Sequence, residues 1–251
     1  MTKIWIAVLA VLLAASSLWG CARGGYTLLD VPKELKIDVK SLSEDADNLM
    51  PSGESTPLIA ALPEEGLYVY ATDATVAAGA LVKYDGVLQY FPWRFTPQLA
   101  KPKLYVTDYN GDGKKDVAIT FAATTGVTHV QENLRVLLRE EKGFHDILYS
   151  TEKAILEAGT HMLVENTQAD QFAVFVDGAR KSFSLSGHGK LSEVIFDRWQ
   201  EYTLGETITV QMRPELYFQN EQEPTYTGMI YTAEISLQNG VLTQTNAQVT
   251  L

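Results

Sequence analysis

Residues 104–121 read LYVTDYNGDGKKDVAITF and say more about the fold than any other stretch. Two runs rich in β-branched and aromatic residues, 104–107 and 117–121, flank a loop of aspartate, asparagine, glycine and lysine. Such runs are typical of strands, and a polar segment containing glycine is typical of the turn between them. The stretch therefore predicts a strand–loop–strand unit.

The loop carries oxygen-bearing side chains at its first, third, fifth and ninth positions, Asp108, Asn110, Asp112 and Asp116. Gly113 at the sixth position permits a sharp turn, and the backbone carbonyl of Lys114 stands at the seventh. Calcium takes about six to eight oxygen ligands from loops of this kind. Three crowded carboxylates also repel one another unless a cation lies between them. We expect calcium to be bound by Asp108, Asn110, Asp112, Lys114 and Asp116. The alternative is an Asx-rich turn without an ion.

The loop is not an EF-hand, because Ile119 stands where that motif has a bidentate glutamate and the flanks are predicted strands. It resembles the calcium loops of FG-GAP/VCBS-type repeats in integrin-like propellers, which have the pattern D-x-[DN]-x-D-G-x-x-D between two strands. The resemblance implies a calcium cofactor and no particular activity. Because the loop occurs once in the chain, a complete propeller is not expected.

Three further turn signals separate strand-like runs: Asp85-Gly86, Asp177-Gly178 and Asn239-Gly240. Such pairs favour hairpins because both central residues take a positive φ. They predict a mostly β fold of antiparallel, hairpin-rich sheets, either sandwich-like or partly propeller-like. Residues 127–139 suit a helix or a strand, and the β context favours a strand. One short helix is expected over 151–158, with Thr151 as its N-cap and Gly159 as its stop.

We expect a β region at 58–150 that contains the calcium loop, and a hairpin-rich β region at 151–251. The two regions can share one core or form separate lobes. Residues 21–57 contain several prolines and glycines and an acidic patch, which favours a flexible tether. The alternative is that Leu35, Ile37, Val39 and Leu42 form a short element that docks on the body.

The first twenty residues resemble a lipoprotein signal peptide. Lys3 precedes a stretch of apolar and small residues, 4–18, which is shorter than the roughly 20 residues that span a membrane. Cys21, the sole cysteine, follows Leu-Trp-Gly, which resembles a lipobox except for its tryptophan. The resemblance is to secreted lipoproteins of Gram-positive type. It implies a diacylglycerol on Cys21 and a location on the outer face of the cell membrane. An ordinary signal peptide or an uncleaved anchor remains the alternative.

The composition and the motifs argue against several classes of function. The formal net charge of −11 disfavours nucleic acid as a partner. The four histidines, 129, 145, 161 and 188, fit no zinc or protease motif, and residues 184–189 form no nucleophile elbow. The aromatic residues of 90–95, and Tyr217, Phe218, Tyr226 and Tyr231, can stack on a sugar when exposed, but burial in the core is the expected outcome.

We therefore expect a calcium-stabilised, lipid-anchored extracytoplasmic β protein that is a binding or structural module of the cell envelope. Its partner would be a cell-wall glycan or another envelope protein. No catalytic residue is indicated, so an enzyme is the less favoured interpretation. The alternative is an envelope hydrolase that acts on polysaccharide or peptide, which would need two converging carboxylates. A transporter's substrate-binding protein is disfavoured because such proteins usually alternate strands with helices.

Overall fold

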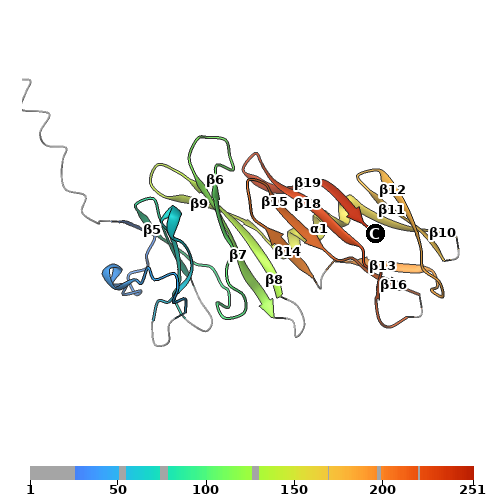
Figure 1. Cartoon of the computed structure of the whole chain (residues 1–251), viewed down its shortest axis with the longest axis horizontal. Coiled ribbons are helices and arrows are strands. Elements are labelled where there is room, and N and C mark those ends of the chain that lie inside the picture. Colours follow the sequence, from blue (N-terminus) through green and yellow to red (C-terminus); the bar gives the residue numbers. More distant parts are fainter. Residues whose placement is uncertain are drawn as a thin grey trace, which may run out of the picture.

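The computed structural model describes residues 26–50, 55–73, 79–125, 130–168, 170–196, 199–219 and 221–251. It confirms a mostly β fold with antiparallel hairpins and one α-helix in these residues. The sheets follow one another along the long axis of the molecule (Figure 1). None of the sheets traced in the described ranges closes into a barrel or a propeller.

The first sheet has the strand order β1-β5-β4-β3-β2. Its strands are β1 (Thr27–Leu29), β2 (Leu58–Leu62), β3 (Leu67–Ala71), β4 (Ala80–Tyr84) and β5 (Val87–Phe91). Only β1 runs parallel to its neighbour. Asp85 and Gly86 connect β4 to β5 with φ values of 47° and 72°, which confirms the predicted hairpin.

The second sheet is an antiparallel meander of β6 (Leu104–Thr107), β7 (Asp116–Thr125), β8 (Val130–Arg139) and β9 (Phe144–Tyr149). The loop at 108–115 connects β6 to β7, as expected from its flanks. Strand β8 confirms that residues 130–139 of the ambiguous segment are extended rather than helical, while residues 127–129 lie outside the described residues.

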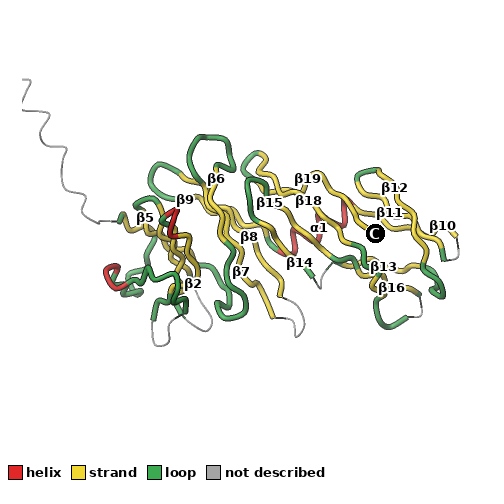
Figure 2. The backbone as a smooth tube through the Cα atoms, in the orientation of Figure 1, coloured by secondary structure: helices red, strands yellow, loops and turns green. Residues whose placement is uncertain are grey.

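Three further sheets follow in the C-terminal half (Figure 2). One contains β10 (Met162–Gln168), β11 (Gln171–Val176) and β12 (Ala179–Ser184), and another contains β13 (Leu191–Ile195), β16 (Glu215–Phe218) and β17 (Thr225–Tyr226). The largest contains β14 (Gln200–Thr203), β15 (Ile208–Met212), β18 (Ile230–Gln238) and β19 (Val241–Thr250). The hairpins predicted at Asp177-Gly178 and Asn239-Gly240 are both present.

Helix α1 (Thr151–His161) starts at the expected residue but is longer than the sequence predicted, and the expected N-cap and stop were both wrong. The N-cap is Ser150, whose side chain accepts a hydrogen bond from the backbone N–H of Lys153. Thr151 instead turns its hydroxyl inward and donates to the carbonyl of Glu132. Gly159 lies inside the helix, because the residues that follow it continue the backbone hydrogen bonds to His161.

The second sheet is a shared middle layer with a core on each face. Side chains alternate along β7, so Val117 and Ile119 pack with the first sheet while Ala118 packs with the C-terminal half. On β8 and β9, Leu134 and Tyr149 also face the C-terminal half. A boundary at residue 150 therefore does not divide two independent cores. One core contains side chains from both sides of it.

Residues 26–50 differ from the expected tether. Their apolar side chains pack on buried residues at the outer face of the first sheet, which leaves the docked alternative as the one observed. Ile37, Val39 and Leu42 belong to this contact, around the 3-10 turn η1 (Val39–Ser41). Spaced apolar residues can cover a sheet face without forming a long regular element. The proline, glycine and acidic content that favoured a tether does not reveal this packing.

The predicted signal peptide, 1–20, and Cys21 lie outside the described residues. Within the part of the chain that is described, no helix has the length and apolar character needed to cross a membrane.

Candidate metal centre and the adjoining pocket

The loop predicted to bind calcium starts and ends at a strand pair. Thr107 at the end of β6 lies opposite Asp116 at the start of β7, so the two ends of the loop are held together. Gly111 and Gly113 have φ values of 75° and 84°, in the left-handed region that favours glycine. These two residues let the intervening chain turn back on itself in a compact loop.

Asp108 organises the loop through backbone N–H groups. Its Oδ1 accepts from Gly111 at 2.7 Å and from Asp112 at 3.1 Å, and its Oδ2 accepts from Gly113 at 2.8 Å. The bond from Gly113 is the main cause that lowers the pKa of Asp108, and the other N–H groups add to it. This carboxylate is therefore held in its charged form.

Asn110 and Asp112 lie at the exposed tip of the loop. The Oδ1 atom of Asn110 accepts from the N–H of Asp112 at 2.9 Å, and Oδ1 of Asp112 accepts from the N–H of Lys114 at 2.8 Å. Both bonds join a side chain to the backbone two residues on, as in Asx turns. The structure thus contains the Asx turns that were expected if the loop is an ordinary turn without an ion.

Asp116 differs from the other loop residues because it is fully buried. Its Oδ2 accepts from the N–H of Tyr109 at 2.9 Å, and its Oδ1 accepts from the N–H of Arg139 at 2.8 Å. Burial raises the pKa of this carboxyl group, and the charges of Asp112 and Asp108 raise it further. The three carboxylates are thus close enough to repel, which is the condition that a cation relieves.

The loop suits calcium in donor chemistry but is not arranged around an ion. Among the described residues, no three histidine, cysteine, aspartate or glutamate side chains converge as a metal site would require. Each carboxylate or amide oxygen has two lone pairs, so an oxygen that accepts one N–H can still bind a cation. Such oxygens remain on all four side chains, and the carbonyl of Lys114 lies between them in sequence. These residues, Asp108, Asn110, Asp112, Lys114 and Asp116, are the ones that would hold the ion.

The loop also contacts both neighbouring parts of the molecule. On one side, Lys115 Nζ binds both carboxylate oxygens of Glu65, which ends the 3-10 turn η2 (Pro63–Glu65) beside the first sheet. On the other side, the hydroxyl of Tyr109 donates to the carbonyl of Gly205 at 2.9 Å, and Thr107 Oγ1 donates to Glu206 at 2.7 Å. The loop therefore joins three parts of the chain.

Sequence reasoning missed Glu65, Arg139 and Glu206 as partners of the loop. They lie between 23 and 99 residues from their partners in the loop and at the end of β6. No local spacing marks them, because each is brought to the loop by the packing of the sheets.

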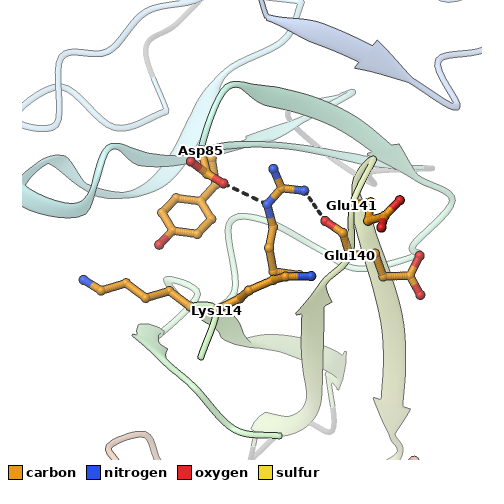
Figure 3. A pocket seen from close by; sticks show the side chains of 7 residues that line it. Asp85, Lys114, Glu140 and Glu141 are labelled. Atoms are coloured by element: carbon orange, nitrogen blue, oxygen red, sulfur yellow. Dashed lines mark hydrogen bonds and ion pairs between the residues drawn. The ribbon is translucent and has the colours of Figure 1, made fainter. Parts of the chain in front are cut away.

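A pocket of about 490 Å³ adjoins the loop (Figure 3). It lies between the β4–β5 turn, the β8–β9 turn and the second half of the loop. Its lining is strongly charged and consists of Tyr84, Asp85, Lys114, Lys115, Arg139, Glu140 and Glu141. Two of the lining residues thus come from the predicted calcium loop itself.

The aromatic residues singled out in the sequence are mostly buried. Trp93 stacks on Phe91 with ring centroids 4.6 Å apart and donates its indole N–H to Asp146 at 2.7 Å. Phe218 and Tyr231 are also in the core. The expected burial is therefore confirmed for Phe91, Trp93, Phe218 and Tyr231. Tyr226 is the exception, with 60% of its surface exposed.

Two of the histidines contact carboxylates. His161 Nδ1 lies 2.6 Å from Asp177, and His188 Nδ1 lies 3.1 Å from Glu221 while its ring stacks on Phe218. No serine is among the hydrogen-bond partners of either ring within the described ranges. These pairs therefore give no support to a serine–histidine site. His129 lies outside the described residues.

Comparison with known proteins gave no relative: no family model, no curated protein and no solved structure matches this chain.

Proposed function

We propose that this chain is a calcium-stabilised, lipid-anchored module of the cell envelope with a binding or structural role. The observation that carries the calcium part is the buried carboxylate of Asp116, which lies close to two other carboxylates of the same loop. None of the ion pairs found in the described ranges includes Asp108, Asp112 or Asp116. A divalent cation would offset this concentration of negative charge.

The contacts of the loop support a structural role for the ion. The loop binds Glu65 beside the first sheet and Gly205 beside the C-terminal sheets, and Thr107 next to the loop binds Glu206. An ion held by the loop would restrict the segment that connects these parts. It would stabilise the whole molecule, because it binds the folded chain and not the unfolded one.

The lipid anchor rests on the sequence around Cys21. Two acyl chains on this cysteine would keep the protein stably at the membrane surface. The outer face of the membrane is also where calcium is abundant enough for a site of ~10⁻⁴–10⁻³ M affinity.

The experiment that tests the calcium part is thermal unfolding in EDTA, in millimolar calcium and in millimolar magnesium. Calcium at ~10 times its dissociation constant would add about 1.4 kcal/mol, which for a chain of this size is a rise of roughly 3–6 °C. Magnesium should give a much smaller rise, because it demands tighter octahedral geometry. Equal melting temperatures in EDTA and calcium would refute the calcium site.

The anchor is tested separately by labelling cells with a radioactive fatty acid. The wild-type chain should carry the label and sediment with membranes. The Cys21→Ser chain should carry none, and a labelled Cys21→Ser chain would show that the anchor is elsewhere.

A further inference from the structure

The charged pocket beside the loop is held around one guanidinium group. Arg139 Nε donates to Asp85 at 2.8 Å, and its Nη1 donates to the carbonyls of Glu140 and Gly143 at 2.7 and 3.1 Å. The side chain is 15% exposed, and the guanidinium lies 5.2 Å from the centre of the Phe144 ring. Arg139 is therefore fixed in place before any ligand arrives.

Arg139 lines the pocket, and part of its guanidinium group has no hydrogen-bond partner among the described residues. The hydrogen bonds of Arg139 with described residues use Nε and Nη1, so the two N–H groups of Nη2 remain for a ligand. The ammonium group of Lys114 is in no ion pair among the residues that the structure describes. A preorganised guanidinium beside an ammonium group is a combination that binds phosphate.

The acidic residues of the pocket do not all oppose an anion. Asp85 already pairs with Arg139, and Figure 3 shows Glu140 and Glu141 on the opposite side of the pocket from Asp85. Lys115 is occupied by Glu65. The formal charges of the lining residues cancel, so the adjoining loop decides the sign of the local field.

The loop and the pocket are connected in two ways. The backbone N–H of Arg139 binds Oδ1 of Asp116, so the pocket's guanidinium and the loop's buried carboxylate share one contact. Lys114 belongs to both sites, since its carbonyl is a predicted calcium ligand and its side chain lines the pocket. Without an ion, three carboxylates next to the pocket repel anions, and one calcium ion would cancel two of these charges.

We propose that this pocket binds the phosphate group of a ligand and that calcium in the loop strengthens the binding. The inference rests on the proposed calcium site. The phosphate ligand should in turn raise the affinity for calcium, because coupling between two binding sites acts equally in both directions.

The test is calorimetric titration of the full chain, purified in a zwitterionic detergent, with glycerol phosphate in EDTA and in calcium. Glycerate and glycerol serve as the carboxylate and neutral analogues, and glycerophosphoglycerol tells a phosphodiester, as in a lipid headgroup, from a free monoester. We expect calcium to tighten glycerol phosphate binding roughly tenfold. Glycerate should bind more weakly and glycerol not at all.

Lys114→Gln removes the pocket's ammonium group but keeps the backbone carbonyl that the ion would use. It should lose roughly tenfold in affinity for glycerol phosphate, while the calcium-induced rise in melting temperature persists. Lys190→Gln is the matched control, because Lys190 is exposed and adjoins β13, far from the pocket (Figure 1). It should bind as the wild type does.

The possible failures are distinguishable. A calcium-induced rise in melting temperature without binding of glycerol phosphate overturns the pocket and leaves the calcium site standing. Binding that is equal in EDTA and calcium overturns the coupling. Glycerate binding as tightly as glycerol phosphate overturns the assignment to phosphate.

Discussion

The backbone N–H of Arg139 donates to Oδ1 of Asp116 over 2.8 Å. This bond joins the last residue of the predicted calcium loop to the end of strand β8, in the sheet that both cores share. The other oxygen of Asp116 accepts from Tyr109 at the beginning of the loop. A single buried carboxylate thus connects the loop, the middle sheet and the edge of the charged pocket.

Asp116→Asn should lower the free energy of unfolding by roughly 1–3 kcal/mol even in EDTA. Each carboxylate oxygen accepts one backbone N–H, and an amide would place its NH₂ group against one of these donors. Urea unfolding in EDTA measures the loss. Asp108→Asn is the comparison at an exposed position, and a loss as large as that of Asp116→Asn would contradict the importance of burial.

Asp112→Ala should leave the melting temperature in EDTA nearly unchanged and remove most of the rise caused by calcium. Its side chain accepts only the exposed N–H of Lys114, so little stability is lost without the ion. Asp45→Ala is a matched control, because Asp45 is also exposed and accepts an N–H two residues on. If Asp112→Ala keeps the full calcium response, Asp112 is not a ligand.

The pH dependence follows from the two shifted carboxyl groups of the loop. Burial raises the pKa of Asp116 in the folded chain above its value in the unfolded chain. Without calcium, the contribution of Asp116 to stability is therefore present below the unfolded pKa and is lost as the pH rises through the folded pKa. The pKa of Asp108 is lowered, so its contribution is present above the unfolded value and is lost as the pH falls through the lowered one.

Calcium competes with protons for Asp116 in particular. The stabilisation by calcium should therefore diminish on acidification, beginning at the raised pKa of Asp116 and before Asp108 is protonated. Urea midpoints with and without calcium, measured at several pH values, give this directly. A calcium effect that stays constant down to the pKa of Asp108 would show that Asp116 does not bind the ion.

Tyr109→Phe should cost about 0.5–1.5 kcal/mol, because it removes the half-buried hydrogen bond from the hydroxyl to the carbonyl of Gly205. The response to calcium should remain, since the hydroxyl is not among the proposed ligands. Tyr105→Phe provides the control, because its hydroxyl makes a longer, exposed bond of 3.3 Å to Glu206. Equal losses for both variants would indicate that Tyr109 does not fasten the loop.

Removal of residues 26–50 should destabilise the first sheet and increase its binding of a hydrophobic dye. These residues cover Leu58, Tyr70, Leu81 and Leu88 on its outer face, and Glu44 pairs with the buried Lys83. Glu44→Gln tests the ion pair alone and should cost less than the deletion. Unchanged urea unfolding and dye binding after the deletion would mean that the segment is a dispensable tether.

The parts of the fold that the sequence predicted are those specified locally. Asp85-Gly86 and Asn239-Gly240 both take positive φ values in turns between strands, so each dipeptide marks its own hairpin. The potential ligands of the loop are also neighbours in sequence, and their spacing is visible without a structure. The N-cap of helix α1 was assigned to Thr151 instead of Ser150 because serine and threonine both cap helices, and only the packing of Thr151 against Glu132 distinguishes them.

By itself, the sequence determined the β class, the hairpins and the order of the loop side chains, because backbone preference and side-chain alternation act over a few residues. Only the tertiary structure decided that the second sheet serves two cores, that residues 26–50 pack on the first sheet and that Asp116 is buried against Arg139. These features join residues far apart in the chain. They depend on which apolar faces pack together, and no local pattern specifies that choice.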